Sequence, residues 1–286
     1  SSNRRQRQMC IRDRGYKSLV YAISFLGFMS FIVWAHHMFL TGMGQSMSAF
    51  FQLTTMIISI TSVVVLTAFF LSRWGGSIRF NTPMLFALSF LPMFGIRGLT
   101  GLPLGVAASD IFLHDTYYVI GHFHYVVAPG TLFALFAGIY YWFPKITGKR
   151  MSESLGKLHF WPSLIFMNGI FMPMFIQGLA GLSRRMYDGG QSYAHASDIL
   201  QWNEFMTISA FCLGLAQIPF VLNIIISLSG KLTGERNPWD STTIEWSAPS
   251  PPLPHVNFDS EIEVYHGPYE YSVPGKEEDF SPQTSQ

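Results

Sequence analysis

The sequence predicts an all-α fold, a polytopic membrane bundle of six transmembrane helices. Of its 286 residues, 49% are hydrophobic and only 12% are charged, which is about half the charged share of soluble domains. Six apolar segments are each long enough to cross about 30 Å of hydrocarbon. The net charge of +1 gives no electrostatic basis for binding nucleic acid. The two cysteines are too few for a disulfide framework.

The six expected spans are, in chain order, Lys17–Trp34, Phe50–Leu71, Pro83–Ala107, Thr116–Phe143, Phe160–Gly181 and Ile199–Leu228. Several contain a proline, at positions 92, 129, 173 and 219. A membrane helix tolerates proline when its neighbours satisfy the freed carbonyl groups. None of the six spans is rich in charge, so each is expected to lie within the membrane.

Three regions of different composition divide the chain. Residues 15–229 contain the six spans and form the expected transmembrane domain. Residues 1–14 are polar and basic and lack the apolar core of a signal peptide. They are expected to be a non-native or unstructured segment, so that the chain begins within a larger protein. Residues 230–286 are rich in proline and predict an extended tail on the inner face of the membrane.

The distribution of Lys and Arg predicts the orientation of the bundle. If the start of the chain is inside, the outer loops are 35–49, 108–115 and 182–198, and the first two contain no Lys or Arg. The third contains Arg184 and Arg185, against the rule. Because the guanidinium fork suits carboxylate and phosphate, this pair indicates an anionic cofactor group at the outer surface. Two solvated loop arginines are the alternative interpretation.

Two histidines near the start of the fourth span carry the strongest functional indication. His122 and His124 are two residues apart, which on a helix is a rotation of about 200°. They must therefore point to nearly opposite faces, and as ligands they would serve two different metals. An ionisable side chain in a membrane span is costly and indicates a functional partner. The alternative is a pair of hydrogen-bonded core histidines.

A second histidine pair follows the first span, on the same predicted outer side. His36 and His37 could bind one metal from a helix end or turn, and imidazole suits copper, iron or zinc. Alone this pair is a weak indication. His114 and Asp115 open the fourth span at the same membrane level, so the candidate ligands and the arginine pair converge there.

Several stretches together resemble one family. The chain is similar to the C-terminal half of subunit I of the heme–copper terminal oxidases, most like the bacterial cytochrome c oxidases, over about residues 15–246. The stretches that carry the resemblance are VWAHHMF (33–39), WGGSIRFNTPMLFAL (74–88), GLTG (98–101), HDTYYVIGHFHYV (114–126), YYWFPKITG (140–148), GKLHFW (156–161), GLAGLSRR (178–185) and NPWDSTTIEW (237–246). It implies six helices of a larger twelve-helix subunit.

The resemblance implies a metal role for four histidines. His36 and His37 look like two ligands of the copper called copper B. His122 looks like the ligand of the high-spin heme iron that faces this copper. His124 looks like an axial ligand of the low-spin heme iron on the other face of the helix.

The resemblance also implies roles for the polar residues beside them. His114 and Asp115 look like ligands of a magnesium ion, and Arg184 and Arg185 look like donors to heme propionates. The implied cofactors are two hemes, of the heme a type, together with copper B and magnesium. The family places the remaining ligands before residue 15, so this chain is expected to be incomplete for activity without the N-terminal half of the subunit.

The implied reaction is the reduction of dioxygen to water coupled to proton translocation in aerobic respiration. The implied partners are subunits II and III, cytochrome c or a similar electron donor, and the lipid bilayer of the bacterial inner membrane, with the mitochondrial inner membrane as the alternative. A heme–copper quinol oxidase is the second reading, and a proton-relaying membrane transporter is the third. The chain departs from the family at Val65, where a proton-delivering lysine is usual, and this puts that proton route in doubt.

Overall fold

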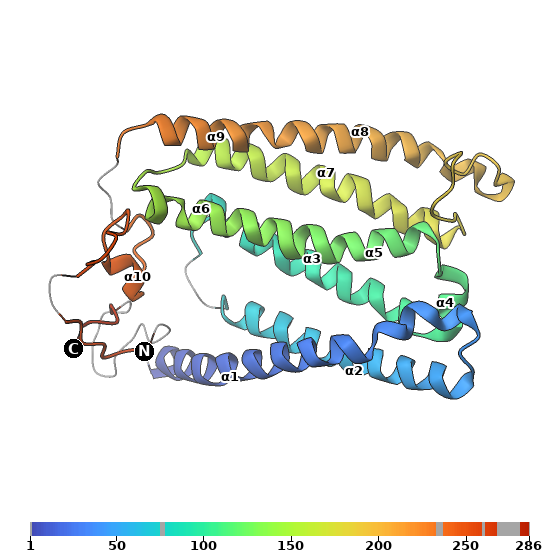
Figure 1. Cartoon of the computed structure of the whole chain (residues 1–286), viewed down its shortest axis with the longest axis horizontal. Coiled ribbons are helices and arrows are strands. Elements are labelled where there is room, and N and C mark those ends of the chain that lie inside the picture. The colour runs from blue at the N-terminus through green and yellow to red at the C-terminus, as the bar shows by residue number, and fades with distance from the viewer. Residues whose placement is uncertain (1, 75–77, 233–236, 259–260, 268–280, 286) are drawn as a thin grey trace.

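The computed structural model describes residues 2–74, 78–232, 237–258, 261–267 and 281–285, with side chains from Lys17 onward. Over these residues the regular structure is helical, as predicted (Figure 1). The β structure described is one isolated antiparallel bridge between Thr116 and Ser183. The helical elements are α1 Ser2–Ile32, η1 Trp34–Thr41, α2 Gln45–Leu71, α3 Thr82–Leu104, α4 Ala107–Leu113, α5 Tyr117–Val127, η2 Ala128–Phe133, α6 Ala134–Thr147, α7 Glu153–Leu179, η3 Ala194–Ile199, α8 Gln201–Ala216, α9 Ile218–Ser229 and α10 Ile244–Ser247.

The prediction of six spans is confirmed. Six helical stretches of the described chain are long and apolar enough to cross a membrane: Lys17–Thr41, Gln45–Leu71, Thr82–Leu104, Tyr117–Thr147, Glu153–Leu179 and Gln201–Ser229. The two largest differences are equal in length: the first span continues through η1 to Thr41 and not only to Trp34, and the fifth span begins at Glu153 and not at Phe160. The side chain of Ser152 caps this start by accepting from the Leu155 N–H. The Glu153 carboxylate accepts from the backbone N–H and the hydroxyl of Thr82, both at 2.9 Å.

The backbone of residues 2–14 continues α1, so the structure gives this segment a helical backbone. Its foreign origin, and the limits 15–229 and 230–286 of the other two regions, stay predictions.

The helices form a bundle in which neighbours in sequence pack on one another. Helix α1 packs on α2, α2 on α3, α3 on α5 and α6, α5 on α7, and α7 on α8. Figure 1 shows η1, α4 and the loop after α7 at one end, and the segment after α9 at the other. We call the first the site end and the second the tail end.

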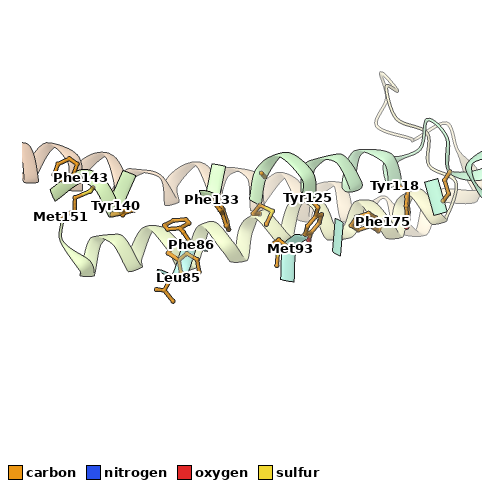
Figure 2. Packing of buried hydrophobic residues seen from close by; sticks show 14 residues of the cluster. Leu85, Phe86, Met93, Tyr118, Tyr125, Phe133, Tyr140, Phe143, Met151 and Phe175 are labelled. Carbon is orange, nitrogen blue, oxygen red and sulfur yellow. The ribbon is translucent and has the colours of Figure 1, made fainter. Parts of the chain in front are cut away.

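The core lies between α3, α5, α6 and α7 (Figure 2). Phe86 of α3 is 0% exposed, and its ring lies edge-on to those of Phe133 and Phe160, with centroids 5.3 and 4.9 Å apart. His159 is also fully buried there. Its two ring nitrogens have hydrogen-bond partners in the Tyr140 hydroxyl at 3.2 Å and the Gln217 side-chain oxygen at 3.0 Å, so this histidine is satisfied within the core.

Two of the prolines within the predicted spans lie where the span changes its helical form. Pro129 lies in η2, a short π-helix that joins α5 to α6. Such widened turns are common where proline removes a backbone donor. Pro219 lies in the first turn of α9, after the break from α8 at Gln217. The Gln217 amide donates to the Ser163 hydroxyl at 3.0 Å, so a polar contact to α7 holds the break in place.

Candidate functional site

The polar residues that the sequence singles out are gathered toward the site end of the bundle. Eight residues were predicted to hold metals or cofactor groups: His36, His37, His114, Asp115, His122, His124, Arg184 and Arg185. They come from η1, the α4–α5 corner, the first turns of α5 and the loop after α7. Residues far apart in sequence are therefore brought to one level of the bundle.

His36 and His37 point their ring nitrogens at one another. Their Nε2 atoms are 3.0 Å apart, and their ring centroids are 4.2 Å apart. Two nitrogens that each lie about 2 Å from one metal ion, at roughly a right angle, would be about 3 Å apart. The pair therefore fits a single metal ion.

A threonine on α2 fixes the tautomer of His36. The Thr55 hydroxyl donates to the Phe51 carbonyl at 2.6 Å, so toward His36 Nδ1, at 3.1 Å, it acts as acceptor. Nδ1 then carries the proton, and Nε2 keeps the free lone pair that a metal ligand needs. Support of a ligand histidine through its second nitrogen is usual in metal sites.

His122 faces α3, and its support repeats this pattern. The Thr100 hydroxyl donates to the Ile96 carbonyl at 2.8 Å and lies 3.1 Å from His122 Nδ1. A Cβ at Gly101 would lie 2.9 Å from the His122 ring, so glycine lets α3 approach the ring this closely.

His124 faces the opposite helix. Its Nδ1 donates to the Ile120 carbonyl at 2.8 Å, which again leaves Nε2 as the free nitrogen. The ring stacks on Phe171 of α7, with centroids 4.3 Å apart and an interplanar angle of 14°. The prediction that His122 and His124 point to opposite faces of their helix is confirmed. Their roles as ligands stay predictions.

A charged corner lies between α4 and α5. His114 Nδ1 is 3.1 Å from the carboxylate of Asp110, and its Nε2 is 3.8 Å from Asp115. Asp115 accepts from Arg184 Nε at 2.7 Å and pairs with Arg184 Nη2 at 2.5 Å. The hydrogen bond from Arg184 lowers the pKa of the Asp115 carboxyl. Burial raises the pKa of Asp110, which is 3% exposed.

The corner contains a pairing that was not predicted, and the predicted roles of its residues stay predictions. Arg184, predicted to bind an anionic cofactor group, pairs with Asp115, which was predicted to bind magnesium. Asp115 has a positive φ of 56°, and its carbonyl accepts from the Arg184 N–H at 2.8 Å. Arg185 is exposed. Over the described part of the chain, no group of three or more His, Cys, Asp or Glu is placed to hold a metal ion.

Removing the Asp115 carboxylate is expected to lower stability at neutral pH but not at low pH. Because Arg184 depresses the pKa of this carboxyl below its ordinary value of 3.8, the contribution is complete above that pH and is lost as the pH falls through the lowered pKa. The side chain is 52% exposed, so the effect is at most about 1 kcal/mol. Thermal unfolding of wild type, Asp115→Asn, Arg184→Gln and the double variant, over a pH series, measures it. If the stability losses of the two single variants sum to the loss of the double variant, the two side chains do not interact and the pairing is contradicted.

Four contacts of this site were not predicted from the sequence. They involve Thr55, Thr100, Asp110 and Arg97. Asp110 could have been found, because it precedes His114 by four residues and so shares its helix face. Arg97 lies inside the α3 span, with its guanidinium 4.8 Å above the Phe94 ring, and its charge acts on His122. A charged residue inside a span indicates function by default.

Comparisons with known proteins give a consistent result. The model of the family described as cytochrome c and quinol oxidase polypeptide I matches residues 12–212. Cytochrome c oxidase subunit 1 of Synechocystis sp. is 42% identical over 261 residues, which are 91% of this chain and 46% of the relative. The alternative cytochrome c oxidase subunit 1 of Bradyrhizobium diazoefficiens is 40% identical over 270 residues, with 94% and 46% covered.

A third relative and a solved structure come from the same group of oxidases. Cytochrome c oxidase subunit 1 of Bacillus subtilis is 41% identical, over 85% of this chain and 39% of the relative. The chain therefore spans about half the length, or less, of these curated relatives. A solved heme–copper terminal oxidase dimer has a TM-score of 0.62 and 19% identity, covering 73% of this chain and 42% of that one. At this identity the likeness supports the fold alone.

Proposed function

The chain belongs to the cytochrome c and quinol oxidase polypeptide I family, and from this membership we propose that it forms part of the catalytic subunit of a cytochrome c oxidase that reduces dioxygen to water. One observation carries the proposal. His122 and His124 lie two residues apart and contact opposite helices, α3 and α7. Each has its Nδ1 held by a neighbouring oxygen. This arrangement suits one helix that serves two hemes.

The donor set fits the expected cofactors. His122 would hold the iron of the high-spin heme and His124 that of the low-spin heme, each through Nε2. His36 and His37 would hold copper B, since their Nε2 atoms converge at 3.0 Å. An iron and a copper bound side by side would supply electrons to both oxygen atoms of one dioxygen molecule.

The chain's own residues orient and support these ligands. Thr55 and Thr100 fix the rings of His36 and His122 by accepting from Nδ1. Gly101 leaves room for the His122 ring. The positive charge of Arg97 acts on His122, and it would favour the reduced form of a metal that His122 held.

The α4–α5 corner is proposed to lie at the outer surface of the membrane, where it would contact the cofactors and the partner subunits. His114 with Asp115 is the proposed magnesium pair, and Arg184 with Arg185 is proposed to meet heme propionates. Arg184, which pairs with the Asp115 carboxylate, would then also bind the heme propionates. The proposed hemes are of the heme a type, and the proposed assembly includes the rest of subunit I with subunits II and III.

The proposed setting is a respiratory complex of the bacterial inner membrane that couples the reaction to proton translocation. Relatives named as cytochrome c oxidases support cytochrome c as the donor. The family description also includes quinol oxidases, so a quinol is the second candidate donor. In either case Val65, which is buried in α2, stands where the family usually has a lysine, and this puts the proton route through that lysine in doubt.

The proposed function is tested on the intact oxidase that contains this chain. We expect a reduced-minus-oxidised optical spectrum with two heme components, of which carbon monoxide shifts one. Oxygen consumption should follow added reduced cytochrome c and not a quinol. Consumption driven by quinol alone would select the second donor. An intact complex without heme absorption would overturn the proposed function.

Loss of either histidine of the 36–37 pair is expected to remove copper B. In His36→Ala or His37→Ala the copper-to-heme ratio should fall while both hemes remain, because two converging nitrogens hold an ion far better than one. Elemental analysis of the purified complex measures this ratio. His195→Ala is the matched control, since that histidine is exposed at the same end of the bundle. A copper content unchanged in both pair variants would contradict the assignment.

A further inference from the structure

A cavity of about 850 Å³ lies toward the tail end, far from the histidine site. Helices α2, α3 and α6 and the segment around Trp239 line it. Small residues on one side of η2 and α6 make the room: Gly130, Ala134, Ala137 and Gly138. Gly130, Ala134 and Ala137 are each about one turn apart and so share a face, and Gly138 adjoins Ala137 at its edge. The volume is within the range of about 300–1,000 Å³ that holds an organic ligand.

The mouth of this cavity carries a surplus positive charge. Arg79 is paired with Asp240 at 2.6 Å. Arg73 instead donates to the backbone carbonyls of Phe69 at 3.2 Å and Ala87 at 3.5 Å. In the described part of the chain no carboxylate pairs with Arg73, and burial lowers its pKa. A partly buried guanidinium of this kind favours an anionic partner.

The cavity lies where the membrane spans end. The α2 span ends at Leu71 and the α3 span begins at Thr82, so the two arginines lie at the level of lipid head groups. Trp142 and Trp239 also line the cavity, and tryptophan is enriched at this level. Trp239 stacks on Tyr141 with centroids 5.8 Å apart, and its Nε1 donates to the Tyr141 carbonyl at 2.9 Å. These two contacts hold the tail segment around Trp239 against the cavity, which has a polar mouth and an apolar interior.

We propose that this cavity binds an anionic phospholipid. Its phosphate would lie on Arg73, through charge-assisted hydrogen bonds, and part of an acyl chain would follow the small-residue face of α6. Basic pockets between transmembrane helices on the cytoplasmic side are suited to anionic head groups. The apolar walls distinguish this ligand from a soluble anion. The proposal does not depend on the proposed oxidase function.

The test uses the intact membrane complex that contains this chain and phosphatidylglycerol with a photoreactive acyl chain. After irradiation, mass spectrometry should find labelling of residues 130–142. We expect the labelling to fall roughly tenfold in Arg73→Gln, because a charge-assisted bond is lost. It should fall similarly in Ala134→Trp, which fills the apolar part without touching the charge. Lys157→Gln is the matched control, since it removes an exposed charge outside the cavity, and its labelling should equal that of wild type.

Four outcomes would overturn the proposal. Labelling that survives both cavity variants would place the lipid elsewhere. Equal labelling by a phosphatidylcholine probe would mean that the anionic charge is not recognised. Loss of labelling on addition of inorganic phosphate would indicate a soluble-anion site. Absence of labelling at residues 130–142 in wild type would show that another part of the assembled protein fills the cavity.

Discussion

Replacing His122 with alanine is expected to remove the heme that binds carbon monoxide, whereas replacing His124 should disturb the other heme. The two rings contact α3 and α7 respectively, so the loss of one ligand leaves the opposite face of α5 intact. Under the proposed function, oxygen reduction should fall to background in His122→Ala, because the residue proposed to hold the oxygen-binding heme would be missing. Reduced-minus-oxidised spectra of the intact oxidase, with and without carbon monoxide, measure both changes.

A neighbour on the same helix serves as control for these variants. Val127 of α5 is 51% exposed, so Val127→Ala shortens a side chain of the same helix without touching either ring, and both heme signals should persist. If His122→Ala and His124→Ala lost the same heme, the two-faced arrangement would be wrong. If neither variant lost a heme signal, the histidines would be structural, and the proposed function would fail with them.

The six spans were predictable because length and apolar composition are local properties. The start of the fifth span was not, since it depends on the contact between Glu153 and Thr82 of α3, and a hydropathy pattern excludes charged residues from a span. Helical geometry alone also predicted the divergence of His122 and His124, because rotation per residue is fixed by the backbone.

The side-chain contacts between helices could not be predicted from the sequence. Thr55 lies 19 residues after His36, and Thr100 lies 22 residues before His122, so neither pair shares a local periodicity. The pairing of Arg184 with Asp115 depends on a left-handed residue at Asp115 and on the bridge between Thr116 and Ser183. Such features follow from how the helices pack, and the packing is decided by side chains distributed over the whole chain.

A methyl group at Gly178 is expected to separate α7 from α5 and to disturb both heme sites together. The Cβ of an alanine there would lie 2.0 Å from the backbone nitrogen of Tyr118 and 2.6 Å from its Cα. Backbone atoms do not rotate away as a side chain does, so the first turn of α5 must move. Overpacking of a core typically costs about 1–3 kcal/mol, and Gly178→Ala should reach or exceed the upper figure.

The displaced turn of α5 leads directly to His122 and His124, so the loss of stability should be accompanied by a loss of heme. We expect a lower thermal midpoint for the purified complex and a smaller heme absorbance per protein, affecting both components. Gly214→Ala on α8 is the matched control, because a Cβ there meets nothing within 4 Å and alanine favours the helix. Wild-type stability in Gly178→Ala would mean that α5 and α7 are farther apart than described, and the placement of His124 against Phe171 would fall with that contact.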